Sequence, residues 1–87
     1  MLYRRWPNWW DDPLAFTPHA LERMLERSVT EVEVRTALDD CEMLAPQHPR
    51  STWIAKCRLE GRPWTFIVTP DTERHRLLVV TMYPSAP

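Results

Sequence analysis

The stretch that decides the fold is TPHALERMLERSVTEVEV, which spans residues 17–34. Thr17 suits the N-cap of a helix, and Pro18 suits the first helical position, where a missing N–H has no helical partner to lose. Four residues with helical spacing then predict one buried stripe, made of Leu21, Met24, Leu25 and the small Ser28. We therefore expect a helix that begins at Pro18.

A second helix is predicted directly after the first. Thr30 and Glu33 have the spacing of a capping box, and Val29 and Val34 have that of a hydrophobic staple. The expected buried stripe of this helix comprises Val34, Ala37, Leu38 and Cys41. Because so few residues join the two helices, they must form a tight hairpin or corner.

The second half of the chain predicts a three-stranded antiparallel meander. Residues 51–59 and 64–69 have the composition and alternation of strands, and residues 76–83 form a last strand whose run at residues 77–80 is apolar on both faces, as in a strand that is central or covered on both sides. Gly61, the only glycine, lies between the first two of them, where a tight hairpin turn needs positive φ.

Two shorter segments complete the predicted fold. Residues 42–50 are expected to form a loop because Pro46 and Pro49 prevent a long helix there, and residues 14–16 are a candidate for a further, edge strand. Helices grouped before strands indicate an α+β fold. We expect two N-terminal helices packed on one face of a small antiparallel sheet of three to four strands.

A chain of 87 residues makes one domain, which we place at residues 14–87, after a tryptophan-rich extension at residues 1–13. Trp6, Trp9 and Trp10 in this extension have three uses. They can fold back as a lid on the core, anchor a protein partner, or stack on bases. The sequence leaves these alternatives open, and we carry partner binding forward as the functional prediction.

Composition and charge limit the function classes. No run approaches the ~20 apolar residues of a membrane span and no signal peptide is visible, so we expect a cytoplasmic protein without a membrane partner. A formal charge of −1 argues against a general nucleic-acid coat. Cys41 and Cys57 lack metal-ligand spacing and are expected to be ordinary buried thiols.

The charges are unevenly distributed along the chain. Acidic residues prevail in the helical half and arginines in the strand half, which permits a local phosphate site. The alternative is that these arginines lie on solvated sheet edges and turns.

His19 is the residue whose setting suggests chemistry. At the second position of a helix, the helix dipole disfavours an imidazolium and favours a neutral base, while the free N–H groups form a seat for phosphate. Arg23, one turn on, can add a bidentate phosphate contact. The alternatives are that His19 is a surface or capping residue and that Arg23 merely pairs with Glu22, Glu26 or Glu31.

Residues on the predicted sheet complete a hypothetical active site. Lys56 and Arg58 share one strand face, and Thr81 on the last strand offers a hydroxyl. A base with two or three cations is what metal-free RNA cleavage requires, because the base accepts the ribose 2′-hydroxyl proton and the cations stabilise the phosphorane. The sequence has no evident Asp/Glu/His cluster for a divalent metal, so we predict neither a metal nor a cofactor.

Residues 16–27, FTPHALERMLER, and residues 29–34, VTEVEV, resemble the signature of the bacterial family called domain of unknown function 4258. The strand VVTMY at residues 79–83 is similar to the closing strand of that family, so the resemblance covers residues 16–83. One departure is Ser28, where the family usually has glycine. If this position needs positive φ, serine costs on the order of 1 kcal/mol.

The resemblance implies a compact α+β fold related to RelE- and BrnT-like toxins, within the wider group of barnase-like and colicin-like ribonucleases. It also implies an active site made of His19, Lys56 or Arg58, and Thr81, with Arg23 in support. The leading hypothesis is therefore a metal-independent toxin ribonuclease that acts on RNA and is held by a cognate antitoxin protein. The alternative is a non-catalytic module that binds protein or nucleic acid with the same fold.

Overall fold

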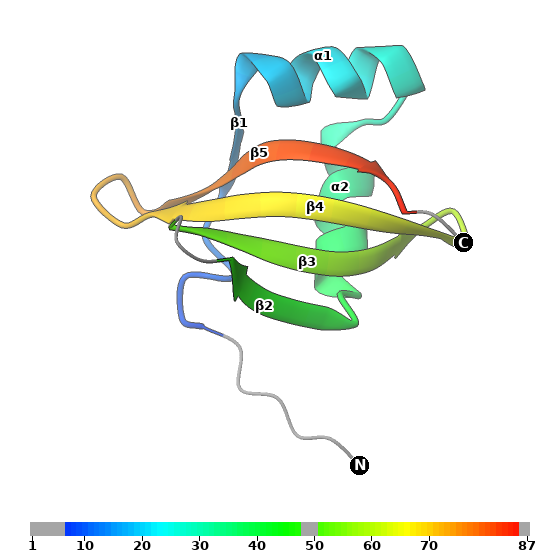
Figure 1. Ribbon diagram of the computed structural model, residues 1–87. Coiled ribbons are helices and arrows are strands. Elements are labelled where there is room, and N and C mark those ends of the chain that lie inside the picture. Colours follow the sequence, from blue (N-terminus) through cyan, green and yellow to red (C-terminus); the bar gives the residue numbers. More distant parts are fainter. Residues whose placement is uncertain (1–6, 48–50, 86–87) are drawn as a thin grey trace.

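Two helices and one sheet make up the computed structural model, which describes residues 7–47 and 51–85 (Figure 1). The elements in chain order are β1 (Leu14–Phe16), α1 (Pro18–Arg27), α2 (Glu31–Asp39), β2 (Met43–Gln47), β3 (Thr52–Leu59), β4 (Arg62–Asp71) and β5 (Arg76–Pro84). None of the helices in this described part is long and apolar enough to cross a membrane.

The five strands form a single sheet in the order β1-β5-β4-β3-β2. The α+β class is confirmed, but the sheet has more strands than the three to four predicted. It is also mixed rather than antiparallel, because β1 runs parallel to β5. Helices α1 and α2 follow β1 in the chain and lead to β2 at the opposite edge of the sheet. The first strand, β1, lies beside the last one, β5.

The loop predicted for residues 42–50 from their prolines is wrong, because the strand β2 (Met43–Gln47) lies there. It pairs antiparallel with β3, and Pro46 lies opposite Trp53. Since β2 is the edge strand, a residue without an N–H is tolerated there. His48–Arg50 lie outside the described residues.

The start of α1 is as predicted, but its buried face is not. Thr17 caps the helix by accepting a hydrogen bond from the Ala20 amide at 3.1 Å. The buried residues are Ala20 and Met24, whereas Leu21 is 45% and Leu25 83% exposed. The helix packs along β5, so the small Ala20, rather than the leucine stripe, faces the sheet.

The junction between the helices follows the local signals in the sequence. Ser28 ends α1 in the left-handed conformation, with φ 56°, so the glycine position of the family signature does require positive φ. Thr30 and Glu33 form the predicted capping box. Val34, Ala37 and Leu38 are buried as expected, and Cys41 is half-buried.

The core lies between the helices and one face of the sheet, which we call the covered face (Figure 1). The buried residues of β3 and β4 alternate as the sequence predicts and include Ala55, Cys57, Phe66 and Val68. In β5 the alternation is shifted between the buried Val79 and Met82, because the β4–β5 register changes between Ile67 and Val68. The opposite, uncovered face carries Ile54, Lys56, Arg58, Ile67 and Thr81. No helix among residues 7–47 and 51–85 lies over that face.

The tryptophans at residues 9 and 10 pack onto the core. Trp10 is 5% exposed, and the Trp9 ring lies 6.1 Å from Trp10 and 5.4 Å from Trp53. Arg35 on α2 holds this segment by donating to the backbone carbonyls of Trp10 and Asp12 at 3.3 and 2.7 Å. The boundary placed after residue 13 therefore does not separate these tryptophans from the domain.

The lid alternative fits the positions of Trp9 and Trp10. Trp10 has almost no surface to offer a partner, so its buried position does not support the partner-binding role predicted for it. Trp6 lies outside the described residues.

Candidate functional site

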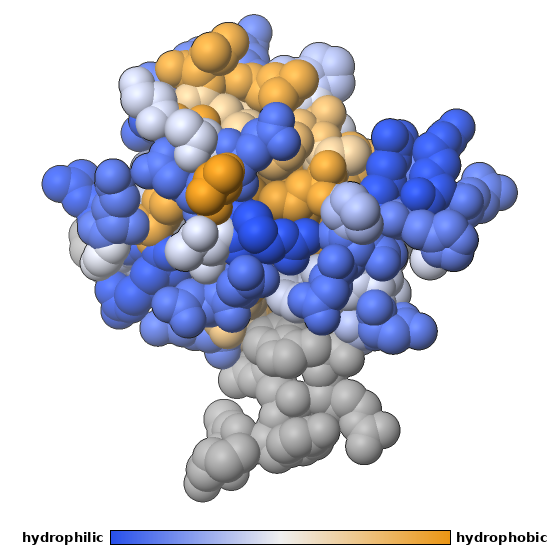
Figure 2. Space-filling view, turned by 180° about the vertical axis from the view of Figure 1, so that it is seen from behind, coloured by the Kyte–Doolittle hydropathy of each residue, from blue (hydrophilic) through white to orange (hydrophobic). Residues whose placement is uncertain are grey.

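His19 lies at the second position of α1 with an exposed side chain. Successive helix residues are rotated by about 100°, so His19 and Arg23 share one flank of α1, and Leu21 and Leu25 share the other. Figure 2, which views the molecule from the α2 side, shows apolar surface over α1, where exposed leucines are expected. His19 and Arg23 therefore lie on the flank of α1 opposite its exposed leucines.

Thr17 fixes the start of α1 against the middle of β5. Its hydroxyl donates to the Val80 carbonyl at 2.6 Å, and its amide donates to the Val79 carbonyl at 3.1 Å. His19 follows Thr17 by two residues, and Thr81 follows Val80 by one. The helix start that carries His19 is thus tied to the segment of β5 that carries Thr81.

The guanidinium group of Arg23 is not fully hydrogen-bonded. Of the three glutamates considered as partners, Glu26 is the one it approaches, at 3.7 Å, in an exposed pair. Such pairs contribute little, typically about 0–1 kcal/mol. The Nε atom of Arg23 is buried and has no hydrogen-bond partner. Because this Nε is screened from solvent, an anion reaches Arg23 through its terminal nitrogens.

Lys56 and Thr81 lie on the uncovered face, on opposite sides of β4. Lys56 is paired with Thr65, whereas Thr81 is paired with Ile67. Two strand spacings put the backbones about 10 Å apart across the sheet. The Lys56 ammonium donates to the Thr65 hydroxyl at 3.0 Å, so it is directed across β4 toward β5.

Arg58 lies on the same face but is engaged in local contacts. Its Nε donates to Glu42 at 3.3 Å, and its terminal nitrogen donates to the Gly61 carbonyl at 3.2 Å. Arg58 also lies two residues after Lys56 in β3, nearer to the β3–β4 turn. The structure thus places Lys56, Arg58 and Thr81 on the uncovered sheet face, and His19 and Arg23 on the helix α1 that begins beside β5.

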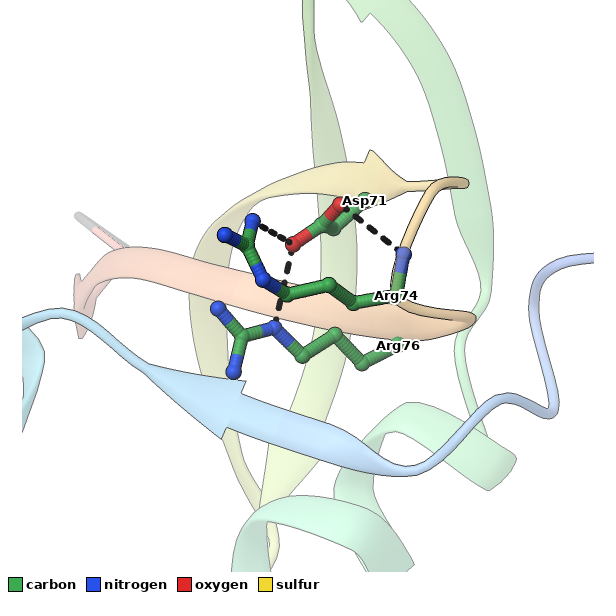
Figure 3. A network of polar contacts seen from close by, with 3 residues as sticks. All are labelled: Asp71, Arg74 and Arg76. Carbon is green, nitrogen blue, oxygen red and sulfur yellow. Dashed lines mark hydrogen bonds and ion pairs between the residues drawn. The ribbon is translucent and has the colours of Figure 1, made fainter.

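Two arginines expected among the basic residues of the strand half belong instead to a turn (Figure 3). Asp71 accepts hydrogen bonds from Arg76 at 3.1 Å and from the Arg74 side chain and amide at 3.4 and 3.3 Å. Although partial burial acts in the opposite direction, the hydrogen bonds from Arg76 and Arg74 hold the pKa of Asp71 below its usual value. Arg74 and Arg76 therefore stabilise the β4–β5 turn.

The two cysteines are free and lie beside each other. A hydrogen bond with Cys41 and burial in the core raise the pKa of the Cys57 thiol far above its ordinary value. Cys57 is therefore an unreactive thiol of the core, as the sequence predicts. Within residues 7–47 and 51–85, no group of three His, Cys, Asp or Glu residues is placed to hold a metal ion.

Sequence reasoning gave Arg27 and Arg62 no role at the site. They line a cavity of about 470 Å³ together with Leu59, Glu60, Trp64 and Pro84. The available signal was the spacing of Arg27, which follows Arg23 by one turn and His19 by two. Arg62 had no comparable signal, because its position depends on the β3–β4 turn.

The comparisons with known proteins agree with the signature in α1. Neither the curated proteins nor the solved structures contain a match to this chain. A family model matches residues 16–84, which is most of the chain and includes both helices and four strands that follow them. The chain therefore belongs to the family described as domain of unknown function (DUF4258).

Proposed function

We propose that this protein is a metal-independent ribonuclease of the RelE- and BrnT-like kind, acting as the toxin of a toxin–antitoxin pair. The observation that carries the proposal is the pair of Thr17 hydrogen bonds to Val79 and Val80. They hold an exposed histidine and an incompletely paired arginine beside the strand that carries Thr81. The uncovered sheet face that carries Thr81 also carries Lys56, the only lysine of the chain.

The proposed reaction uses the 2′-hydroxyl of RNA as the nucleophile. Neutral His19 accepts its proton, the 2′ oxygen attacks phosphorus, and the 5′ oxygen leaves with a proton from solvent, which yields a 2′,3′-cyclic phosphate. Arg23 and Lys56 stabilise the negative charge of the phosphorane, and Thr81 donates a hydrogen bond to it. Lys56 must exchange its hydrogen bond with Thr65 for one with the substrate.

The proposed partner is a cognate antitoxin protein. The uncovered sheet face exposes part of Ile54 and Ile67 next to Lys56 and Thr81, and no described helix covers them. A protein that binds this face buries apolar surface and blocks access of RNA to the same residues. This supports inhibition of the ribonuclease by an antitoxin that covers its active site.

Growth inhibition tests the proposal in cells. Expression of the parent should arrest growth, and His19→Ala and Lys56→Ala should each remove this effect while the fold is retained. His75→Ala is the matched control, because His75 is an exposed histidine in the β4–β5 turn. The catalytic assignment is wrong if both site variants inhibit growth as strongly as the parent does.

A non-catalytic binding module remains the second candidate, and specific contacts favour it. Lys56 is already bonded to Thr65, and Arg58 to Glu42 and Gly61, which are contacts that a purely structural role explains. This candidate predicts RNA or protein binding by the parent without any cleavage. It is supported if RNA remains intact at saturating protein concentration while binding is measurable.

A further inference from the structure

The cavity lined by Arg27 and Arg62 lies at the end of the sheet where α1, the β3–β4 turn and the end of β5 meet (Figure 1). Its two arginines come from different elements, α1 and β4, and neither forms an ion pair with any described residue. A volume of about 470 Å³ is within the ordinary range for small-ligand pockets. The cavity can therefore admit a group as large as a nucleotide.

The walls of the cavity are suited to a phosphate group. Guanidinium groups bind phosphate oxygens in bidentate fashion. Trp64, Leu59 and Pro84 provide an apolar wall. Trp64 and Leu59 are each 7% exposed, so they form the floor of the cavity and do not offer a stacking surface to a base. Glu60 is the one acidic residue of the lining, so two positive charges face one negative charge.

The cavity lies on the covered side of the sheet, near the C-terminal end of the helix that carries His19. His19, Arg23 and Arg27 follow one another at intervals of four residues, and each is rotated by about 40° from the previous one, so Arg27 lies about 80° around α1 from His19, on the side of the buried Ala20. The axial distance from His19 to Arg27 is about 12 Å. Arg23 and Arg27 also repel each other at this spacing, and an anion bound along the helix relieves that repulsion.

We infer that this cavity is a phosphate-binding subsite for single-stranded RNA, in which Arg27 and Arg62 hold a phosphodiester distant from the bond at His19. The inference rests on the proposed ribonuclease function and names how its substrate is held. An oligonucleotide reaches both His19 and the cavity, whereas a mononucleotide occupies one of them.

Binding of a short RNA to the His19→Ala variant isolates the subsite from cleavage. The probe is a fluorescein-labelled hexanucleotide of RNA, measured by anisotropy at several salt concentrations. Arg27→Ala or Arg62→Ala in this background should raise Kd about tenfold or more. Each should also reduce the salt slope by about 0.7, the value for one lost phosphate contact on a single strand.

Matched variants separate the subsite from a general charge effect. Arg74→Ala removes the same charge from the opposite end of the sheet, and Kd should stay within about twofold of the parent, since that arginine is bound to Asp71. Glu60→Gln removes the acidic group of the cavity and should tighten RNA binding. Circular dichroism and thermal unfolding of each variant check that the fold is retained.

Each outcome has a defined meaning. Equal Kd and salt slope for the parent, Arg27→Ala and Arg62→Ala overturn the subsite, even if the protein cleaves RNA. Loss of binding in both variants with no cleavage by the parent supports the subsite and overturns the ribonuclease. Equal affinity for a labelled hexaglutamate peptide overturns the RNA assignment, because the cavity then binds anionic protein segments as well.

Discussion

The two ends of the sheet both carry arginines, but their surroundings differ in one respect. At the β4–β5 turn, Arg74 and Arg76 donate to Asp71 within 3.4 Å (Figure 3). At the opposite end, Arg27 and Arg62 line a cavity and form no ion pair with any residue in the described part of the chain. All four arginines carry the same charge. Arg74 and Arg76 are bound to Asp71 and have a structural role, whereas Arg27 and Arg62 have no such partner and are candidates for binding a ligand.

The largest expected effect is on catalysis, and it compares Arg23, which lies on the same helix as Arg27, with Arg74 of the β4–β5 turn. Arg23→Ala should lower kcat/KM for RNA cleavage by about 10²-fold, because it removes a donor to the charge that develops on the phosphorane. Arg74→Ala removes an equal charge from the β4–β5 turn and should change kcat/KM by no more than about twofold. Cleavage of an end-labelled RNA in the presence of a chelator measures both values.

Equal losses for the two variants would indicate that only the total positive charge matters. Unchanged cleavage by Arg23→Ala would remove this residue from the site. Its buried Nε would then need a structural explanation.

Relief of backbone strain should have an effect of intermediate size on the free energy of unfolding at both ends of the sheet. Ser28 after α1 and His75 in the β4–β5 turn have φ of 56° and 51°, a conformation that costs non-glycine residues roughly 1 kcal/mol. Ser28→Gly should therefore raise the free energy of unfolding by about 1 kcal/mol, and His75→Gly by a similar amount. Urea denaturation measures both, and a destabilised Ser28→Gly variant would show that the serine side chain contributes more than its strain costs.

The pH dependence of the Asp71 turn is the smallest expected effect. Because the folded-state pKa of Asp71 is lowered, its stabilisation is complete above about pH 4 and is lost as the pH falls through that lowered pKa. Asp71→Asn should therefore lower Tm at pH 7, and its difference from the parent should shrink below about pH 4. Asp39→Asn, which breaks an exposed pair with Arg35, is the control with a smaller effect.

A difference between parent and Asp71→Asn that stays constant down to pH 2 would contradict the lowered pKa. The hydrogen bonds from Arg74 and Arg76 would then be too weak to favour the carboxylate form of Asp71.

Local signals were enough to predict the helices but not their orientation. The caps at Thr17 and Thr30 depend on residues within one turn, so both helix starts followed from the sequence. The buried face of α1 depends on where β5 lies, and the stripe through Leu21 and Leu25 was therefore wrong. The edge strand β2 was missed because a proline that excludes a central strand is tolerated at an edge.

Some features of the candidate site were likewise predictable from the local sequence, and others depend on long-range contacts. The position of His19 at a helix start was predictable, because it follows from the Thr17–Pro18 cap. The anchoring of the start of α1 beside the segment of β5 that carries Thr81 depends on the parallel pairing of β1 with β5, which links residues more than 60 positions apart. The cavity at Arg62 depends on the packing of α1 over the end of β5, and no short-range pattern records that contact.

Cleavage of RNA by the purified protein, in the presence of EDTA, tests the central claim most directly. The substrate is a short RNA, compared with the same sequence carrying 2′-deoxyribose at every position. We predict cleavage of the RNA alone, with a 2′,3′-cyclic phosphate product detected by mass spectrometry, and a loss of about 10²-fold or more in His19→Ala but not in His75→Ala. Cleavage of both substrates, or equal cleavage by the parent and His19→Ala, would contradict the account.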